Sequence, residues 1–144
     1  MPKTDDILQV LVVDDEKNIR DGCERILTRS GFQVLKASTG AEALGILAEQ
    51  IIPVVLLDLK MPGIDGMEVL ARIRELDEPI LVIVITGFAT VETAIEAMKQ
   101  GAYDFIPKPF EPDQLRIVVN RAVEKLRLTR EAQSLERERN RTLA

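Results

Sequence analysis

Five short apolar runs alternate with amphipathic segments between residues 9 and 106. The runs cover residues 9–13, 33–37, 54–57, 81–85 and 103–106. Their lengths and their content of Val, Ile and Leu are typical of buried strands. The segments between them, residues 17–30, 40–50, 66–76 and 91–100, are expected to be helices. Strands that alternate with helices in this way predict βαβ units and a parallel sheet.

The first expected helix shows where its buried face lies. Ile19, Cys23, Ile26 and Leu27 fall on one face of it, and Gly31 marks its end. Because crossovers between parallel strands are right-handed, such helices cover both faces of the sheet. We therefore predict an α/β fold with a doubly wound, flavodoxin-like sheet of five parallel strands in the order 2-1-3-4-5.

The last segment of the chain follows a different pattern. Pro112 suits the first turn of a helix, and neither Gly nor Pro interrupts residues 113–144. Apolar residues mark one face of the first half, at Leu115, Val118, Val119, Ala122 and Leu126. Beyond Leu128 the sequence is highly charged. We expect one domain over residues 1–127 and a helical extension, residues 128–144, leading toward a further domain outside this sequence. The extension is either a fraying solvated tail or a helix that dimerises or transmits a signal.

Composition excludes several classes of function. The 144 residues are 46% hydrophobic, which is enough for one domain with its own core. No apolar run approaches the roughly 20 residues that span a bilayer, and a signal-peptide pattern is absent, so we expect a cytoplasmic protein without a membrane partner. A net charge of −5 gives no sign of direct nucleic-acid binding. One cysteine and no histidine exclude an internal disulfide, a zinc site and a histidine-based triad.

Two of the expected strands end in carboxylates. Asp14 and Asp15 follow the first strand, and Asp58 follows the third. In the order 2-1-3-4-5 these strands flank the point where the strand order reverses, which is where open α/β sheets bind ligands. Three carboxylates gathered there need a cation, and an all-oxygen set suits Mg²⁺ or Mn²⁺.

Two further polar groups are expected at the same edge of the sheet. Thr86 and Gly87 follow the fourth strand, and Lys108 follows the fifth. Together the edge would carry a nucleophilic carboxylate, a metal site, a hydroxyl and an ammonium, which is the set of groups that phosphoryl transfer requires. A carboxylate can itself attack phosphorus and become an acyl phosphate.

As a set, these residues resemble the receiver domain of two-component response regulators, the CheY-like domains. The resemblance rests on Asp14-Asp15, Asp58 with Met61-Pro62 and Gly66, Thr86-Gly87, and Lys108-Pro109, and it covers about residues 7–127. Residues 101–110 followed by a long helix are similar to receivers of enhancer-binding transcription activators, and also to receivers of hybrid sensor proteins.

The resemblance implies a phosphoacceptor and a metal site. Asp58 would accept the phosphoryl group. Asp14, Asp15, Asp58 and the backbone carbonyl of Lys60 would hold Mg²⁺, with Asp14 acting partly through water.

The resemblance also implies a switch. Lys108 would bind the phosphoryl group, and the peptide bond between Lys108 and Pro109 would be cis. Thr86 would move toward the phosphoryl oxygens, and Phe105 would take the position of the switch aromatic. The surface of the fourth helix, the fifth strand and the fifth helix would then change its partners.

Because the chain has no histidine, it cannot carry its own phosphohistidine donor. The expected partners are a histidine kinase or a phosphotransfer protein, and an effector domain beyond the extension. A homodimer through the fourth helix, fifth strand and fifth helix, or through the last helix, is also expected. The domain would contribute to its own phosphorylation and dephosphorylation without being an enzyme for an outside substrate. The bulk of Lys60 and Phe88, each two residues after a site residue, predicts slow self-dephosphorylation.

Other functions stay open at this stage. A phosphohydrolase of the aspartyl-phosphate type would have a second acid two residues after its nucleophile, where this chain has Lys60. A nucleotide or flavin module would need a glycine-rich loop after the first strand, where this chain has acids. An inactive receiver used as a scaffold would lack a site residue, and none is missing.

Overall fold

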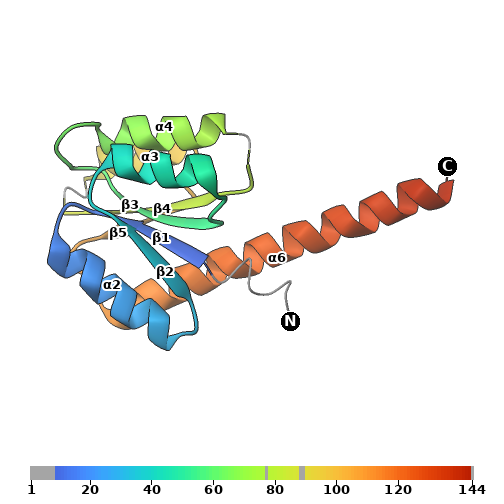
Figure 1. The fold of residues 1–144 in the computed structure, drawn as a ribbon, viewed down its shortest axis with the longest axis horizontal. Helices are drawn as coiled ribbons and strands as arrows, with labels where there is room; N and C mark the ends of the chain where they lie inside the picture. Colours follow the sequence, from blue (N-terminus) through green and yellow to red (C-terminus); the bar gives the residue numbers. More distant parts are fainter. Residues whose placement is uncertain (1–8, 77, 88–89, 144) are drawn as a thin grey trace.

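The computed structural model describes residues 9–76, 78–87 and 90–143, and side chains up to residue 139. A single parallel sheet forms the centre of the fold, with its strands in the order β2-β1-β3-β4-β5 (Figure 1). The strands are β1 (Gln9–Val13), β2 (Gln33–Ala37), β3 (Val54–Asp58), β4 (Leu81–Thr86) and β5 (Asp104–Pro107). The predicted doubly wound, flavodoxin-like sheet is therefore confirmed.

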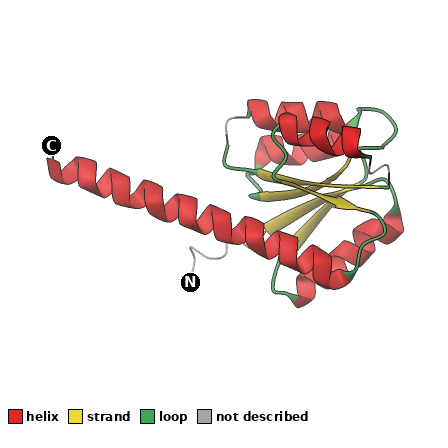
Figure 2. Ribbon diagram, turned by 180° about the vertical axis from the view of Figure 1, so that it is seen from behind, coloured by secondary structure: helices red, strands yellow, loops and turns green. Residues whose placement is uncertain are grey.

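Helices cover both faces of the sheet (Figures 1 and 2). They are α2 (Lys17–Arg29), α3 (Gly40–Glu49), α4 (Gly66–Glu75), α5 (Val91–Lys99) and α6 (Pro112–Leu143). One hydrophobic core lies between the sheet and α3, α4 and α5, and a second lies between the sheet and α2 and α6. No helix among the described residues combines the length and the apolar character needed to cross a bilayer.

The central strand β3 shows why the strands are continuous apolar runs in the sequence. All five of its residues are buried. Val55 and Leu57 enter the core beneath α3, α4 and α5, whereas Val54 and Leu56 enter the core beneath α2 and α6. A strand in a parallel sheet covered on both faces has no solvent side, so it needs apolar residues at successive positions rather than alternating ones.

Three strands, β3, β4 and β5, end one residue later than predicted, and the extensions of β3 and β4 reach a site residue. Asp58 pairs with Ile85, and Thr86 pairs with Pro107, so each is the last residue of its strand. Sequence reasoning ended these strands where the apolar run ended. The ladder with the neighbouring strand continues past that point and fixes the backbone of both polar residues.

The start of α4 is held tightly against the end of β3. Asp65 caps the helix, its side chain accepting the N–H of Met67, and Gly66 donates its own N–H to the Leu59 carbonyl over 3.1 Å. A Cβ at Gly66 would lie 2.6 Å from the carbonyl oxygen of Asp58. Only glycine therefore allows this approach, which fixes the backbone beside Asp58.

Helix α6 begins in the core and ends outside it. Leu115 and Val119 are fully buried against the sheet, and Leu126, 3% exposed, is the last buried residue of the helix as far as residue 139. Beyond it Leu128 and Leu135 are 57% and 63% exposed, and the helix projects away from the sheet (Figures 1 and 2). The residues that the sequence pattern assigned to the buried face all pack, and Val123 packs with them.

Candidate functional site

Three aspartates meet at the carboxyl edge of the sheet. Asp14 directly follows β1 and Asp58 ends β3, and the two strands lie side by side with Val13 opposite Leu57. One carboxylate oxygen from each of Asp14, Asp15 and Asp58 lies within 4.8 Å of the others. Asp14 and Asp58 are buried, whereas Asp15 is exposed. The structure thus brings the three predicted metal-ligating side chains together.

The two buried carboxylates are fixed by their own loops. Asp14 Oδ1 accepts the backbone N–H of Glu16 over 2.9 Å, and Asp58 Oδ1 accepts the backbone N–H of Lys60 over 3.1 Å. The Arg20 guanidinium donates to the backbone carbonyl of Asp14 over 2.8 Å. These bonds occupy one oxygen of each carboxylate, and the Oδ2 atoms lie toward the ammonium group that faces both.

That ammonium belongs to Lys108, which follows β5. Its Nζ lies 2.7 Å from Asp14 Oδ2 and 3.2 Å from Asp58 Oδ2, and its side chain is only 13% exposed. Its backbone N–H donates to the carbonyl of Thr86 over 2.9 Å, which joins the ends of β4 and β5. The peptide bond from Lys108 to Pro109 is cis.

Burial and charge act against each other at this cluster. Burial raises the pKa of the Asp14 carboxyl above its usual value, although Lys108 and the N–H of Glu16 act in the opposite direction. Burial alone would lower the pKa of Lys108, but Asp14 and Asp58 outweigh it and raise that pKa above its usual value. Lys108 therefore stays charged at neutral pH, as a counter-ion for two buried carboxylates.

The donor set fits a hard divalent cation. All three candidate ligands are carboxylates, and Mg²⁺ binds oxygen in preference to nitrogen or sulfur. Asp14 Oδ2 is buried and accepts no hydrogen bond, because its contact with the Lys108 ammonium lacks hydrogen-bond geometry. Three carboxylates with one ammonium also leave an excess of negative charge, which a cation would neutralise.

Thr86 and Phe105 lie on one face of the sheet. Thr86 is fully buried, and Phe105, opposite Val84, is half-buried against the core beneath α3, α4 and α5. Val84 belongs to the same core. Since side chains alternate along a strand, Thr86, two residues after Val84, points to the same face.

Known proteins resemble this chain in sequence and in fold. A family model described as the response regulator receiver domain matches residues 10–120. The chain belongs to that family. It is 42% identical over 127 residues to an NtrX-like response regulator of Rickettsia bellii, covering 87% of this chain and 27% of that protein. It is 38% identical over 128 residues to the C4-dicarboxylate transport transcriptional regulatory protein DctD of Rhizobium meliloti, covering 89% and 28%.

Solved structures agree with the family. A crystal structure of NtrX from Brucella abortus superposes with a TM-score of 0.83 at 38% identity, covering 88% of this chain and 29% of that one. This receiver domain thus spans little more than a quarter of the length of the relatives that it matches. Its relatives are regulators of two-component systems.

One residue of the receiver site was not predicted from the sequence. Glu16 Oε2 lies 3.2 Å from Lys108 Nζ, although the two residues are 92 positions apart. The sequence placed Glu16 only in an acidic run after the first strand. The position of Glu16 directly after Asp15 could have indicated that it lies near the site. Its contact with Lys108, however, depends on how the loops after β1 and β5 meet.

Two expectations concern residues around the acceptor. The Lys60 side chain is exposed, and its backbone N–H bonds to Asp58. Phe88, the other residue expected to slow dephosphorylation, lies outside the described residues. Slow dephosphorylation stays a prediction.

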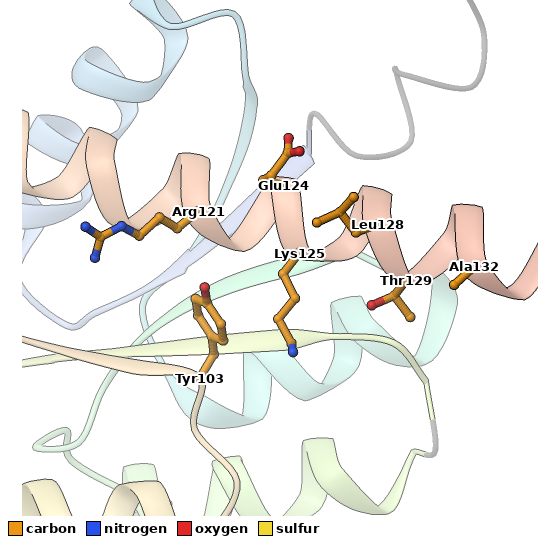
Figure 3. A pocket seen from close by; sticks show the side chains of 7 residues that line it. All are labelled: Tyr103, Arg121, Glu124, Lys125, Leu128, Thr129 and Ala132. Atoms are coloured by element: carbon orange, nitrogen blue, oxygen red, sulfur yellow. The ribbon is translucent and has the colours of Figure 1, made fainter.

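A shallow groove lies between Tyr103, the residue before β5, and the middle of α6 (Figure 3). It measures about 500 Å³, and it is lined by Tyr103, Arg121, Glu124, Lys125, Leu128, Thr129 and Ala132. Tyr103 lies beneath α6, on the side toward which the Lys125 side chain points (Figure 3). The groove borders the surface expected to change partners, where α6 leaves the sheet.

Proposed function

We propose that the chain is a signalling switch controlled by phosphorylation of Asp58, with Mg²⁺ as cofactor and a histidine kinase or phosphotransfer protein as donor. One observation carries the proposal. The ammonium of Lys108, a partly buried side chain, lies within 3.2 Å of the buried carboxylates of Asp14 and Asp58, beside a third aspartate. Stability alone does not require such a cluster, whereas an acyl phosphate needs both its cation site and its ammonium.

The transfer step follows from the chemistry of Asp58. A carboxylate oxygen attacks phosphorus, a new O–P bond forms, and the bond from phosphorus to the donor atom breaks with its electron pair leaving on the donor. Asp14, Asp15, Asp58 and the backbone carbonyl of Lys60 would hold Mg²⁺, or Mn²⁺, which neutralises phosphoryl oxygens when bound. Lys108, already beside Asp58, bonds another of these oxygens.

The signal would leave through α5, β5 and α6. Thr86 would turn its hydroxyl toward the phosphoryl group, and Phe105 on the same face would move with it. Helix α5 exposes three large apolar side chains on this surface, Val91 at 76%, Ile95 at 50% and Met98 at 47%. Exposed apolar side chains grouped on one helix are suited to a protein partner.

We propose residues 1–127 as the receiver and residues 128–144 as a linker to an effector domain. Residues 128–139 are exposed except for the half-buried Arg130, and many of them are charged, as expected for a helix whose partner lies elsewhere. A homodimer through α5, β5 and α6, or through the outer half of α6, would use the same surfaces. In this proposal the domain is a phosphoacceptor with its own phosphorylation and dephosphorylation chemistry. It is not an enzyme for an outside substrate, and it binds neither nucleic acid nor membrane directly.

The test is direct phosphorylation of the purified chain. With Mg²⁺ and acetyl phosphate, the mass should rise by one phosphoryl group, and beryllofluoride should raise the melting temperature by binding the folded state. Asp58→Asn should abolish both effects, whereas Asp104→Asn, a similar change in β5, should leave both in place. The proposal would be wrong if the unaltered chain showed neither the mass increase nor the rise in melting temperature, or if Asp58→Asn responded equally.

A further inference from the structure

Lys108 has a third carboxylate partner beyond the two buried aspartates. Glu16 Oε2 lies 3.2 Å from Lys108 Nζ in hydrogen-bond geometry, and the Glu16 side chain is 60% exposed. Glu16 is the N-cap residue of α2, but its side chain makes no capping hydrogen bond. Glutamate is not a preferred N-cap residue, so capping does not explain the side chain at this position. Instead, the Glu16 side chain contacts Lys108.

Three carboxylates surround the ammonium group. Glu16 and Asp58 accept hydrogen bonds from Lys108 Nζ, and Asp14 Oδ2 is an ion-pair contact at 2.7 Å. A phosphoryl oxygen that binds Lys108 must therefore compete with these carboxylates for the ammonium. Asp14 is buried, so its release would leave an uncompensated charge in the interior. Glu16 can return to water at low cost because most of its side chain is already exposed.

We propose that Glu16 holds, on Lys108, the position that a phosphoryl oxygen takes after phosphorylation of Asp58, and that it thereby opposes phosphorylation. The inference rests on the proposed function of Asp58. Glu16 acts in two ways that have the same sign. It competes for the ammonium, and its charge repels an incoming phosphoryl dianion. In this role Glu16 is a positioning residue, because it acts through Lys108.

The expected effect is modest because the Glu16–Lys108 pair is largely exposed. Removing the charge with Glu16→Gln should tighten beryllofluoride binding in saturating Mg²⁺ by about two- to five-fold, the range typical of exposed ion pairs. The gain should shrink in high salt, since screening weakens exposed pairs. Mg²⁺ binding in the absence of the anion should be unchanged or slightly weaker, because a neighbouring negative charge is lost. Tighter anion binding without tighter metal binding is an outcome that damage to the fold would not produce.

The experiment is calorimetric titration of the full chain with Mg²⁺ alone and then with beryllofluoride at saturating Mg²⁺. The control is Glu49→Gln, which makes the same change of charge at the end of α3. Glu49 shares a surface with Ile80, the residue before β4, so it lies at the opposite edge of the sheet. Glu49→Gln should bind beryllofluoride as the unaltered chain does.

A second measurement follows phosphorylation by acetyl phosphate. Glu16→Gln should lower the KM for acetyl phosphate with the maximal rate changed less, because the competition acts on binding of the phosphoryl group. Glu16→Asp keeps the charge but is one methylene shorter, so its KM should lie between those of the unaltered chain and Glu16→Gln. Melting temperatures of the variants verify that each is folded.

The outcomes separate the two proposals. If the unaltered chain binds beryllofluoride and Asp58→Asn does not, the proposed function stands. Equal beryllofluoride affinities for Glu16→Gln and Glu49→Gln would then overturn the role of Glu16 alone, as would weaker binding by Glu16→Gln. If the unaltered chain fails to bind, or Asp58→Asn binds equally well, both proposals fall.

Discussion

Replacing Lys108 with methionine tests whether its ammonium supports two buried carboxylates. The change keeps a side chain of similar length and removes the charge that lies 2.7 Å from Asp14 and 3.2 Å from Asp58. Removing one partner of a buried ion pair costs about 3–5 kcal/mol, because the other charge is left without compensation. Lys108 keeps 13% exposure, so we expect the lower end, about 3 kcal/mol lost from the free energy of unfolding in metal-free buffer.

Lys36→Met is the matched control. Lys36 also contacts two carboxylates, Asp21 at 3.5 Å and Glu24 at 2.8 Å, but all three side chains are at least 35% exposed. Solvent screens such pairs, and so the control should lose far less stability than Lys108→Met. The two variants remove the same charge from similar arrangements, and burial is the main difference between them.

Urea denaturation with and without Mg²⁺ measures both effects. Mg²⁺ should stabilise Lys108→Met more than the unaltered chain, because the metal replaces the missing positive charge and no longer faces a competing ammonium. At a hundred times its Kd, a ligand of the folded state adds about 2.7 kcal/mol, enough to recover most of the loss. An equal loss for Lys36→Met, or an equal gain from Mg²⁺ in both chains, would refute the reasoning.

Lowering the pH should restore part of the stability that Lys108→Met loses. Burial raises the pKa of Asp14 in the folded state above 3.8, and Lys108→Met removes a group that opposes this rise. The folded state then binds more protons than the unfolded state at pH values above 3.8, so this group favours folding more as the pH falls through that window. The stability deficit of Lys108→Met should therefore narrow below neutral pH, whereas a constant deficit would contradict the assignment.

Two further predictions concern packing. Gly66→Ala should destabilise the domain by about 1–3 kcal/mol, because its Cβ would lie 2.6 Å from the carbonyl oxygen of Asp58. Gly45→Ala, with open space around it in α3, should stabilise the domain by about 1 kcal/mol. Urea denaturation of the two variants checks both signs. Cys23 is 1% exposed and burial raises the pKa of its thiol to about 12, so it should react with a disulfide reagent at pH 8 only after unfolding. Rapid labelling of the native chain would contradict that burial.

Most of the fold could be predicted because its signals are local. Strands buried on both faces need apolar residues at successive positions, as in β3, and the unbroken run after Pro112 allows one continuous helix. The ends of β3 and β4 were harder to predict from the sequence. Asp58 and Thr86 belong to these strands because a neighbouring strand pairs with them, and a polar residue at the end of an apolar run does not reveal its pairing partner.

The site could be predicted only in part from the sequence. Asp14 and Asp15 are adjacent carboxylates, yet Asp14 is fully buried and Asp15 is exposed. The Asp14 carboxylate lies against Lys108, whereas Asp15 is the exposed member of the same cluster. The link between Glu16 and Lys108 likewise depends on a contact across 92 residues. Motif spacing can indicate which residues gather, but it does not assign their burial or their hydrogen bonds.

The arrangement around Lys108 is better explained by switching than by stability. A buried ion pair can often be replaced by apolar residues without loss of stability, and here Asp14 stays in the core even though burial raises its pKa. What the cluster provides is an ammonium with two fixed buried partners, Asp14 and Asp58, and one exposed partner, Glu16. In the proposed switch, a phosphoryl group on Asp58 would let Lys108 exchange Glu16 for a phosphoryl oxygen while the Lys108 backbone stays bonded to the carbonyl of Thr86. Because that bond joins the ends of β4 and β5, the proposed switch would connect a change at Asp58 to β5, the strand that pairs with β4.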